Sequence, residues 1–167
     1  MSFWAYPELA NTKKKLMSYK QDTELEVKVK IDDKDDISSY IVSSQHRKSK
    51  GNARKSIWSI SQKEEFECFV FSKVNKWCKN HYGWGIHLVN NSLGVLGHNT
   101  IKDETKELKF AKFIDGNQNK TWHGYPADYM TKIQDIPSTN VLYAWVQNGY
   151  ITKAKMSKIL QGQRCNL

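Results

Sequence analysis

The residues from 23 to 31 carry the pattern that most constrains the fold. Polar and apolar residues alternate strictly through Thr-Glu-Leu-Glu-Val-Lys-Val-Lys-Ile. A strand has a period of two, so Leu25, Val27, Val29 and Ile31 share one face and the charged side chains share the other. The segment predicts a strand whose apolar face is covered by another layer of the domain.

A second pattern predicts the helix that provides this cover. Ser61-Gln62-Lys63-Glu64 has the form of a capping box, in which the serine and the glutamate satisfy free amides of the first turn. Apolar residues then recur at spacings of three and four, which gives one broad buried face: Phe66, Phe69, Val70, Val74, Trp77 and Cys78. We expect a helix from Ser61 to about Asn80, packed across the sheet.

Further strands are predicted on both sides of this helix. Residues 39–42 form a short strand, and residues 108–114 form another. Residues 84–89 and 93–98 flank an Asn-Asn-Ser turn signal and predict a hairpin. The expected sheet is antiparallel and has about four to five strands.

The C-terminal third predicts a helical hairpin over residues 138–162. Pro137 and Ser138 begin the first helix, Gly149 follows its end, and Thr152 begins the second. Residues 1–22 have only a thin apolar stripe and predict a peripheral helical arm. With 39% apolar residues and no long linker, we expect one α+β domain over residues 1–167.

The sequence also predicts where the protein resides. No apolar run has the length of a membrane span, and the N-terminus lacks the pattern of a signal peptide, so we expect a cytoplasmic protein with no membrane partner. The three cysteines, Cys68, Cys78 and Cys165, are odd in number and are expected to be reduced.

Positive charge indicates a polyanionic partner. The formal net charge is +9, and the segment 46–55 has five cations and no acidic residue. We expect these cations to contact nucleic-acid phosphates: Arg47, Lys48, Lys50, Arg54 and Lys55. The tail from 150 to 167 is basic as well, and the alternative for both segments is a solvated surface with no ligand.

The segment from Lys120 to Tyr129 is the strongest candidate for a functional loop. Trp122 can stack on a base, and His123 can transfer a proton near neutral pH. Tyr125 or Lys112 can stabilise charge that develops on a phosphate. These residue types meet the needs of RNA cleavage without a metal ion, whereas the structural alternative places both aromatics in the core.

Two more histidines can join this site. If the predicted hairpin has a two-residue loop, His87 and His98 share a face of the sheet. His98 and His123 would then exchange protons as general base and general acid, whereas a histidine taken alone is more often a structural residue.

Metal and cofactor sites have less support. Cys68 and Cys78 fall on the apolar face of the predicted helix, so zinc ligation together with His81 is disfavoured. Glu107-Leu108-Lys109 after Asp103 has the Glu-x-Lys form of some metal-dependent nucleases, but it lacks an evident acidic partner on a preceding strand. There is no phosphate-binding loop, dinucleotide fingerprint or nucleophile elbow. We expect no metal and no cofactor.

These features favour a basic protein that engages nucleic acid, RNA rather than DNA. The candidate activity is a metal-independent endoribonuclease of the toxin or phage-defence type, and the order of elements is loosely similar to small RNase toxins at the level of fold alone. The alternative is a non-catalytic module, which binds nucleic acid or a protein partner through exposed aromatics and the helical hairpin.

Overall fold

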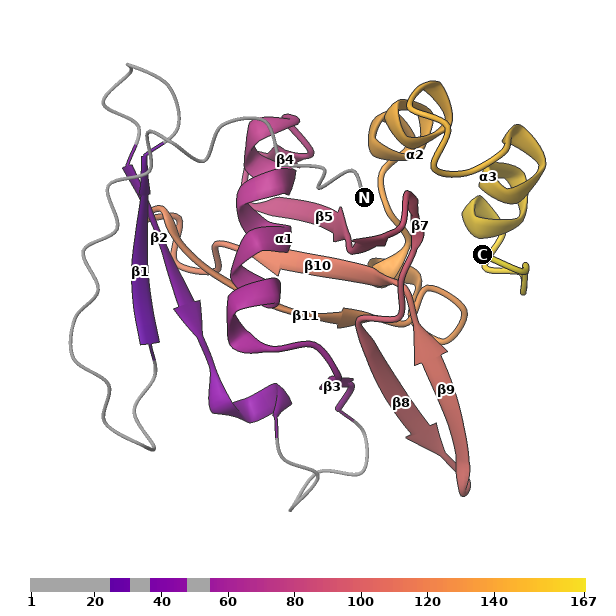
Figure 1. Ribbon diagram of the computed structural model, residues 1–167, viewed down its shortest axis with the longest axis horizontal. Coiled ribbons are helices and arrows are strands. Elements are labelled where there is room, and N and C mark those ends of the chain that lie inside the picture. Colours follow the sequence, from indigo (N-terminus) through magenta and orange to yellow (C-terminus); the bar gives the residue numbers. More distant parts are fainter. Residues whose placement is uncertain (1–24, 31–36, 48–54) are drawn as a thin grey trace.

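The computed structural model describes residues 25–30, 37–47 and 55–167. The predicted arm at residues 1–22 lies outside these ranges. The described chain has the expected α+β class, with one helix lying across a sheet and two helices beyond one end of that sheet (Figure 1). None of the described helices has the length and apolar character needed to cross a bilayer.

The main sheet has six strands and is mixed, so it is larger than the predicted antiparallel sheet. Strand β2 pairs in parallel with β11, with Ser39 opposite Thr121, and the other neighbours are antiparallel. Across the sheet the strands are β1 (Leu25–Lys30), β2 (Ile37–Val42), β11 (Thr121–Ala127), β10 (Phe110–Ile114), β5 (Tyr82–Ile86) and β4 (Cys78–Lys79).

The predicted hairpin of residues 84–98 forms only in part. Strands β6 (Leu88–Val89) and β7 (Ser92–Leu93) pair around Asn90 and Asn91, which both have positive φ. The chain then leaves this ladder, and β8 (Gly97–Ile101) pairs with β3 (Ile57–Trp58) and β9 (Glu104–Leu108) in a separate sheet. The predicted strand 108–114 is likewise divided, because Lys109 separates β9 from β10.

Helix α1 (Gln62–Val74) confirms the predicted capping box. Ser61 Oγ accepts a hydrogen bond from the Glu64 amide, and the Glu64 carboxylate accepts one from the Ser61 amide. The helix ends earlier than the predicted Asn80, since Lys76 has a φ of 59°. Trp77 is nevertheless buried, because it packs edge-on against Trp145, and this tertiary contact extends the apolar pattern past the helix.

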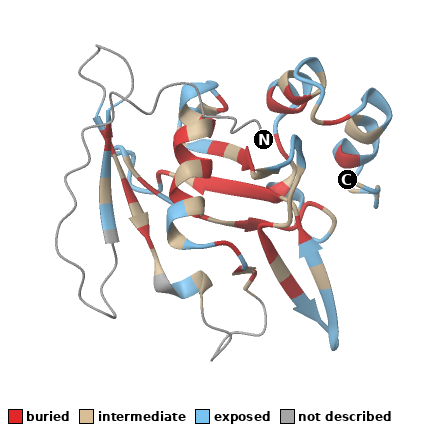
Figure 2. Ribbon diagram, viewed as in Figure 1, coloured by how far each residue is buried: buried red, intermediate tan, exposed pale blue. Residues whose placement is uncertain are grey.

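Phe69 lies at the centre of the contact between α1 and the sheet. Its ring stacks on Tyr40 with centroids 4.6 Å apart, and it also meets Phe113 at 5.3 Å and Trp122 at 5.8 Å. These three partners come from β2, β10 and β11. Buried residues therefore line both α1 and the strands behind it (Figure 2).

The two predicted C-terminal helices are present, and both predicted N-caps are confirmed. Ser138 caps α2 (Thr139–Gln147) and Thr152 caps α3 (Lys153–Leu160), each through its hydroxyl oxygen. Gly149 in the turn between them has a φ of 75°, which a glycine adopts without steric cost. The buried residues around Trp145 of α2 form a core cluster separate from the one around Phe69.

Phe69→Ala should lower the free energy of unfolding by roughly 3–5 kcal/mol, because a fully buried ring is lost and a cavity remains. Val74 was predicted on the buried face of this helix, but its side chain is 47% exposed, since it lies in the last turn of α1 away from the sheet contact. Val74→Ala is therefore the matched control and should cost much less. Urea denaturation of the parent and both variants measures the difference. Equal stability of the two variants would show that Phe69 does not hold α1 on the sheet.

Candidate functional site

The segment predicted as a loop is strand β11, inside the main sheet. Its side chains alternate between the two faces of that sheet. Trp122 is only 4% exposed and packs on Phe69 of α1, so it belongs to the core and does not present its ring for base stacking. His123 and Tyr125 consequently point to the opposite face. This face carries the candidate site.

The strand register arranges the opposite face in three rows. Each row takes one residue from β5, one from β10 and one from β11. They are the outer row of Tyr82, Ile114 and His123, the middle row of Trp84, Lys112 and Tyr125, and the inner row of Ile86, Phe110 and Ala127.

The side chains become more exposed to solvent from the inner row to the outer row. The inner row is fully buried, and Phe110 packs on Trp145 of α2 with ring centroids 5.0 Å apart. In the outer row, Tyr82 is 51% exposed and His123 is also exposed. We call the outer and middle rows, together with His46, the open face.

His46 reaches the open face from the short helix η2 (Ser44–His46), which follows β2. Its ring stacks on Tyr125 with centroids 5.4 Å apart and an interplanar angle of 21°. Its Nδ1 lies 2.8 Å from the carbonyl oxygen of Ser56. A carbonyl can only accept, so Nδ1 carries the proton of the neutral ring and Nε2 keeps its lone pair.

The surroundings of His46 favour this neutral form. Burial is the main cause that lowers its pKa below the ordinary value, and the nearby Lys55, His123 and Lys132 lower it further, against the hydrogen bond to Ser56. A neutral imidazole with a lone pair on Nε2 can act as a general base at neutral pH.

Lys112 provides a cation in the middle row. It is only 5% exposed, and its ammonium donates to the carbonyl oxygen of Gln134. The same ammonium lies 5.4 Å from the ring centroid of Tyr82 and 5.6 Å from that of Trp84, which are cation–π distances. Burial lowers the pKa of Lys112, and the charge of Asp135 opposes this change.

Tyr125 is a positioning residue in this arrangement. Its hydroxyl donates to Asp135 Oδ1 at 2.7 Å, while the other oxygen of Asp135 accepts from the Asp128 amide at 2.9 Å. Burial and the Asp135 carboxylate raise the pKa of Tyr125 well above its usual value. The hydroxyl proton is thus committed to Asp135, and the ring supports His46.

His98 does not lie beside His123, contrary to the sequence-based expectation. It sits on β8, where its Nδ1 is 3.0 Å from Ser59 Oγ, just before α1. His87 is also on that side, with Nε2 3.9 Å from a carboxylate oxygen of Glu64. His46 lies on the same face as His123, because its ring stacks on Tyr125, two residues along β11. No local sequence pattern marked His46 apart from its position at the start of the basic segment.

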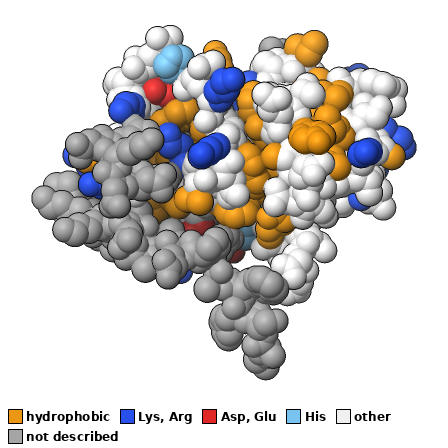
Figure 3. Space-filling view, turned by 90° about the horizontal axis from the view of Figure 1, so that it is seen from above, with side chains coloured by type: hydrophobic (Ala, Val, Ile, Leu, Met, Phe, Trp, Pro, Cys, Tyr) orange, Lys and Arg blue, Asp and Glu red, His pale blue; other side chains and the backbone are white. Residues whose placement is uncertain are grey.

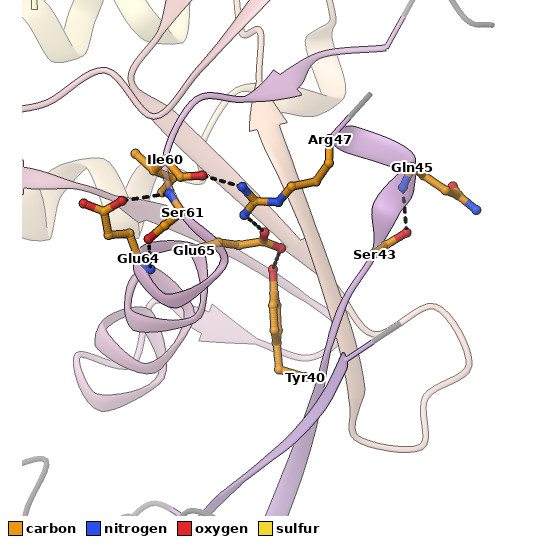
Figure 4. A network of polar contacts seen from close by, with 8 residues as sticks. All are labelled: Tyr40, Ser43, Gln45, Arg47, Ile60, Ser61, Glu64 and Glu65. Atoms are coloured by element: carbon orange, nitrogen blue, oxygen red, sulfur yellow. Dashed lines mark hydrogen bonds and ion pairs between the residues drawn. The ribbon is translucent and has the colours of Figure 1, made fainter. Parts of the chain in front are cut away.

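The basic segment begins with a buried ion pair. The Arg47 guanidinium donates to the Ile60 carbonyl and to the Glu65 carboxylate, which also accepts from the Tyr40 hydroxyl (Figure 4). Both terminal nitrogens of Arg47 are therefore engaged within the protein and not directed to a phosphate. Lys55 is partly exposed and contacts Gln45. The other three predicted phosphate contacts, Lys48, Lys50 and Arg54, lie outside the described residues.

Within residues 25–30, 37–47 and 55–167, no cluster of three or more His, Cys, Asp or Glu side chains is arranged to hold a metal ion. Comparison with known proteins gave no match to any family model, to any curated protein or to any solved structure. Any function must therefore be inferred from the residues of the site itself.

Arg47→Met should destabilise the fold by roughly 3–5 kcal/mol at pH 7, because Glu65 would remain as a buried, uncompensated charge. Burial already raises the pKa of Glu65. Protonation at pH 5 would remove that charge, so the penalty should be smaller there. Lys55→Met is the control and should change stability little. Urea titrations at both pH values test this, and a small, pH-independent loss would contradict it.

Proposed function

We propose that the protein binds RNA on the open face and cleaves it without a metal ion, with His46 as the general base and His123 as the general acid. The observation that carries the proposal is the placement of these two imidazoles, with the largely buried Lys112 ammonium, on the sheet face opposite α1. Histidines paired in this way transfer protons near neutral pH.

The proposed reaction uses the 2′-hydroxyl of RNA as its nucleophile. Neutral His46 accepts the hydroxyl proton at Nε2, and the 2′-oxygen attacks the adjacent phosphorus. The bond to the 5′-oxygen breaks, and protonated His123 donates a proton to that leaving oxygen. The products are a 2′,3′-cyclic phosphate and a 5′-hydroxyl. Lys112 stabilises the extra negative charge of the transition state.

Two properties support RNA as the substrate. DNA lacks the 2′-hydroxyl that this reaction needs. The net charge of +9 favours encounter with a polyanion, and Lys55 and Lys132 lie close enough to His46 to affect its pKa. An activity of this kind suits a cytoplasmic toxin or phage-defence nuclease.

The histidine roles can be tested by RNA cleavage assays on His46→Ala and His123→Ala. Each substitution should reduce kcat/KM by roughly a hundredfold or more while leaving the melting temperature close to that of the parent. His87→Ala, on the α1 side of the sheet, is the control and should retain activity. EDTA should not affect the parent. Full activity of a folded His46→Ala or His123→Ala variant, or loss of parental activity in EDTA, would refute the mechanism.

The pH dependence of kcat/KM tests the protonation state of His46. Activity requires the neutral ring, so it should fall as the pH drops through the lowered pKa of His46, with a midpoint below the ordinary histidine value of about 6.5. Lys132→Met removes a nearby positive charge, so the midpoint should move to higher pH. Lys158→Met on α3 is the charge-matched control and should leave it in place. An unchanged midpoint in Lys132→Met would argue against His46 as the base.

A non-catalytic binding module remains the second candidate, because apolar side chains are exposed near the C-terminal helices. Tyr143 of α2 is 56% exposed, and Val74 and Leu160 are also exposed. Hydrophobic side chains gather in the middle and on the right of the view from above (Figure 3). If the parent cleaves no RNA, this surface and the open face become candidates for binding a protein or an uncleaved nucleic acid.

A further inference from the structure

We propose that Tyr82 forms a subsite for an unpaired base, so that the substrate is single-stranded RNA. This inference rests on the proposed function and specifies its substrate. Tyr82 combines a large exposed ring with a place in the same row as His123. Stacking of bases on exposed aromatic rings is how many proteins hold single strands.

The position of Tyr82 suits a base beside the scissile phosphate. Neighbouring strands are about 4.8 Å apart, so β5 and β11 lie about 10 Å apart with β10 between them. A base on Tyr82 of β5 directs its phosphate along the outer row across β10, and the leaving oxygen then meets His123 of β11. One nucleotide can thereby contact the base subsite and the catalytic groups together.

The contact with Lys112 prepares the Tyr82 ring for stacking. The ammonium lies over the ring at 5.4 Å from its centroid, which restrains the ring by a cation–π interaction. About half of the side chain still remains exposed to a ligand. Ile114, next to Tyr82 in the outer row, is partly exposed and provides an apolar side chain that the base can contact.

This geometry discriminates against duplex RNA. Bases within a duplex are already stacked on both faces, and a base must leave that stack before a protein ring can cover it. A duplex can still be attracted by the net charge of +9, but it gains nothing from Tyr82. The ring of Tyr82 should therefore contribute to single-strand affinity alone.

The test compares two exposed tyrosines in the full-length protein. Tyr82→Ala and Tyr82→Leu remove the ring at the subsite, and Tyr143→Ala removes a ring of similar exposure from α2. The probe is a fluorescein-labelled RNA of about 16 nucleotides, of mixed and non-self-complementary sequence, with 2′-O-methyl groups, which prevent cleavage, and the comparison ligand is its duplex with the complementary strand made in the same way. Fluorescence anisotropy gives Kd for both ligands, and melting curves confirm folding.

We expect both Tyr82 variants to bind the single strand roughly tenfold more weakly than the parent, with duplex affinity unchanged. Tyr143→Ala should match the parent on both ligands. Unchanged single-strand affinity in the Tyr82 variants, or an equal loss on the duplex or in Tyr143→Ala, would overturn the base subsite while RNA binding itself stands. A parent that binds neither ligand would overturn the proposed function and the subsite together.

Discussion

The packing of Phe69 against Tyr40, Phe113 and Trp122 determines the arrangement of everything else in the sheet. These partners come from three different strands, so one ring of α1 fixes which face of β2, β10 and β11 is internal. Because side chains alternate along a strand, the same contact also fixes which residues face away from α1. The candidate site of this protein lies on the face that α1 leaves uncovered.

A buried ion pair connects this core to the candidate base. Arg47 is held by Glu65 and by the Ile60 carbonyl on the α1 side. The preceding residue, His46, turns to the other side and stacks on Tyr125. The segment after β2 is therefore anchored on the α1 side of the sheet by Arg47 and on the open face by His46. The hydrogen bonds of Arg47 and Glu65 offset the free-energy cost of removing their charges from water. The ion pair also fixes the backbone next to His46 and so helps to position its imidazole.

Local patterns predicted the features that depend on local physics. The capping box at Ser61, the N-caps at Ser138 and Thr152 and the alternating strand β1 were all predicted, because their signals lie within a few residues. The sequence also singled out His123 and Lys112 as candidate site residues, and the register places both on the sheet face opposite α1. It could not predict the parallel pairing of β2 with β11 or the approach of His46, because these contacts join segments far apart in the chain. Trp122 was expected in a functional loop where it could stack on a base, with a place in the core as the alternative; the segment is strand β11, and packing against Phe69 of α1 puts the ring in the core.

The inner row is buried and the outer row is exposed, so substitutions in the two rows have different consequences. A change at Phe110 or Ile86 opens a cavity beneath α2 and threatens the fold, so those positions are constrained by stability. A change at Tyr82 leaves the interior intact and alters only the surface presented to a ligand. If the open face binds a ligand as proposed, a single substitution in the outer row can therefore change which ligand is preferred without a compensating mutation in the core.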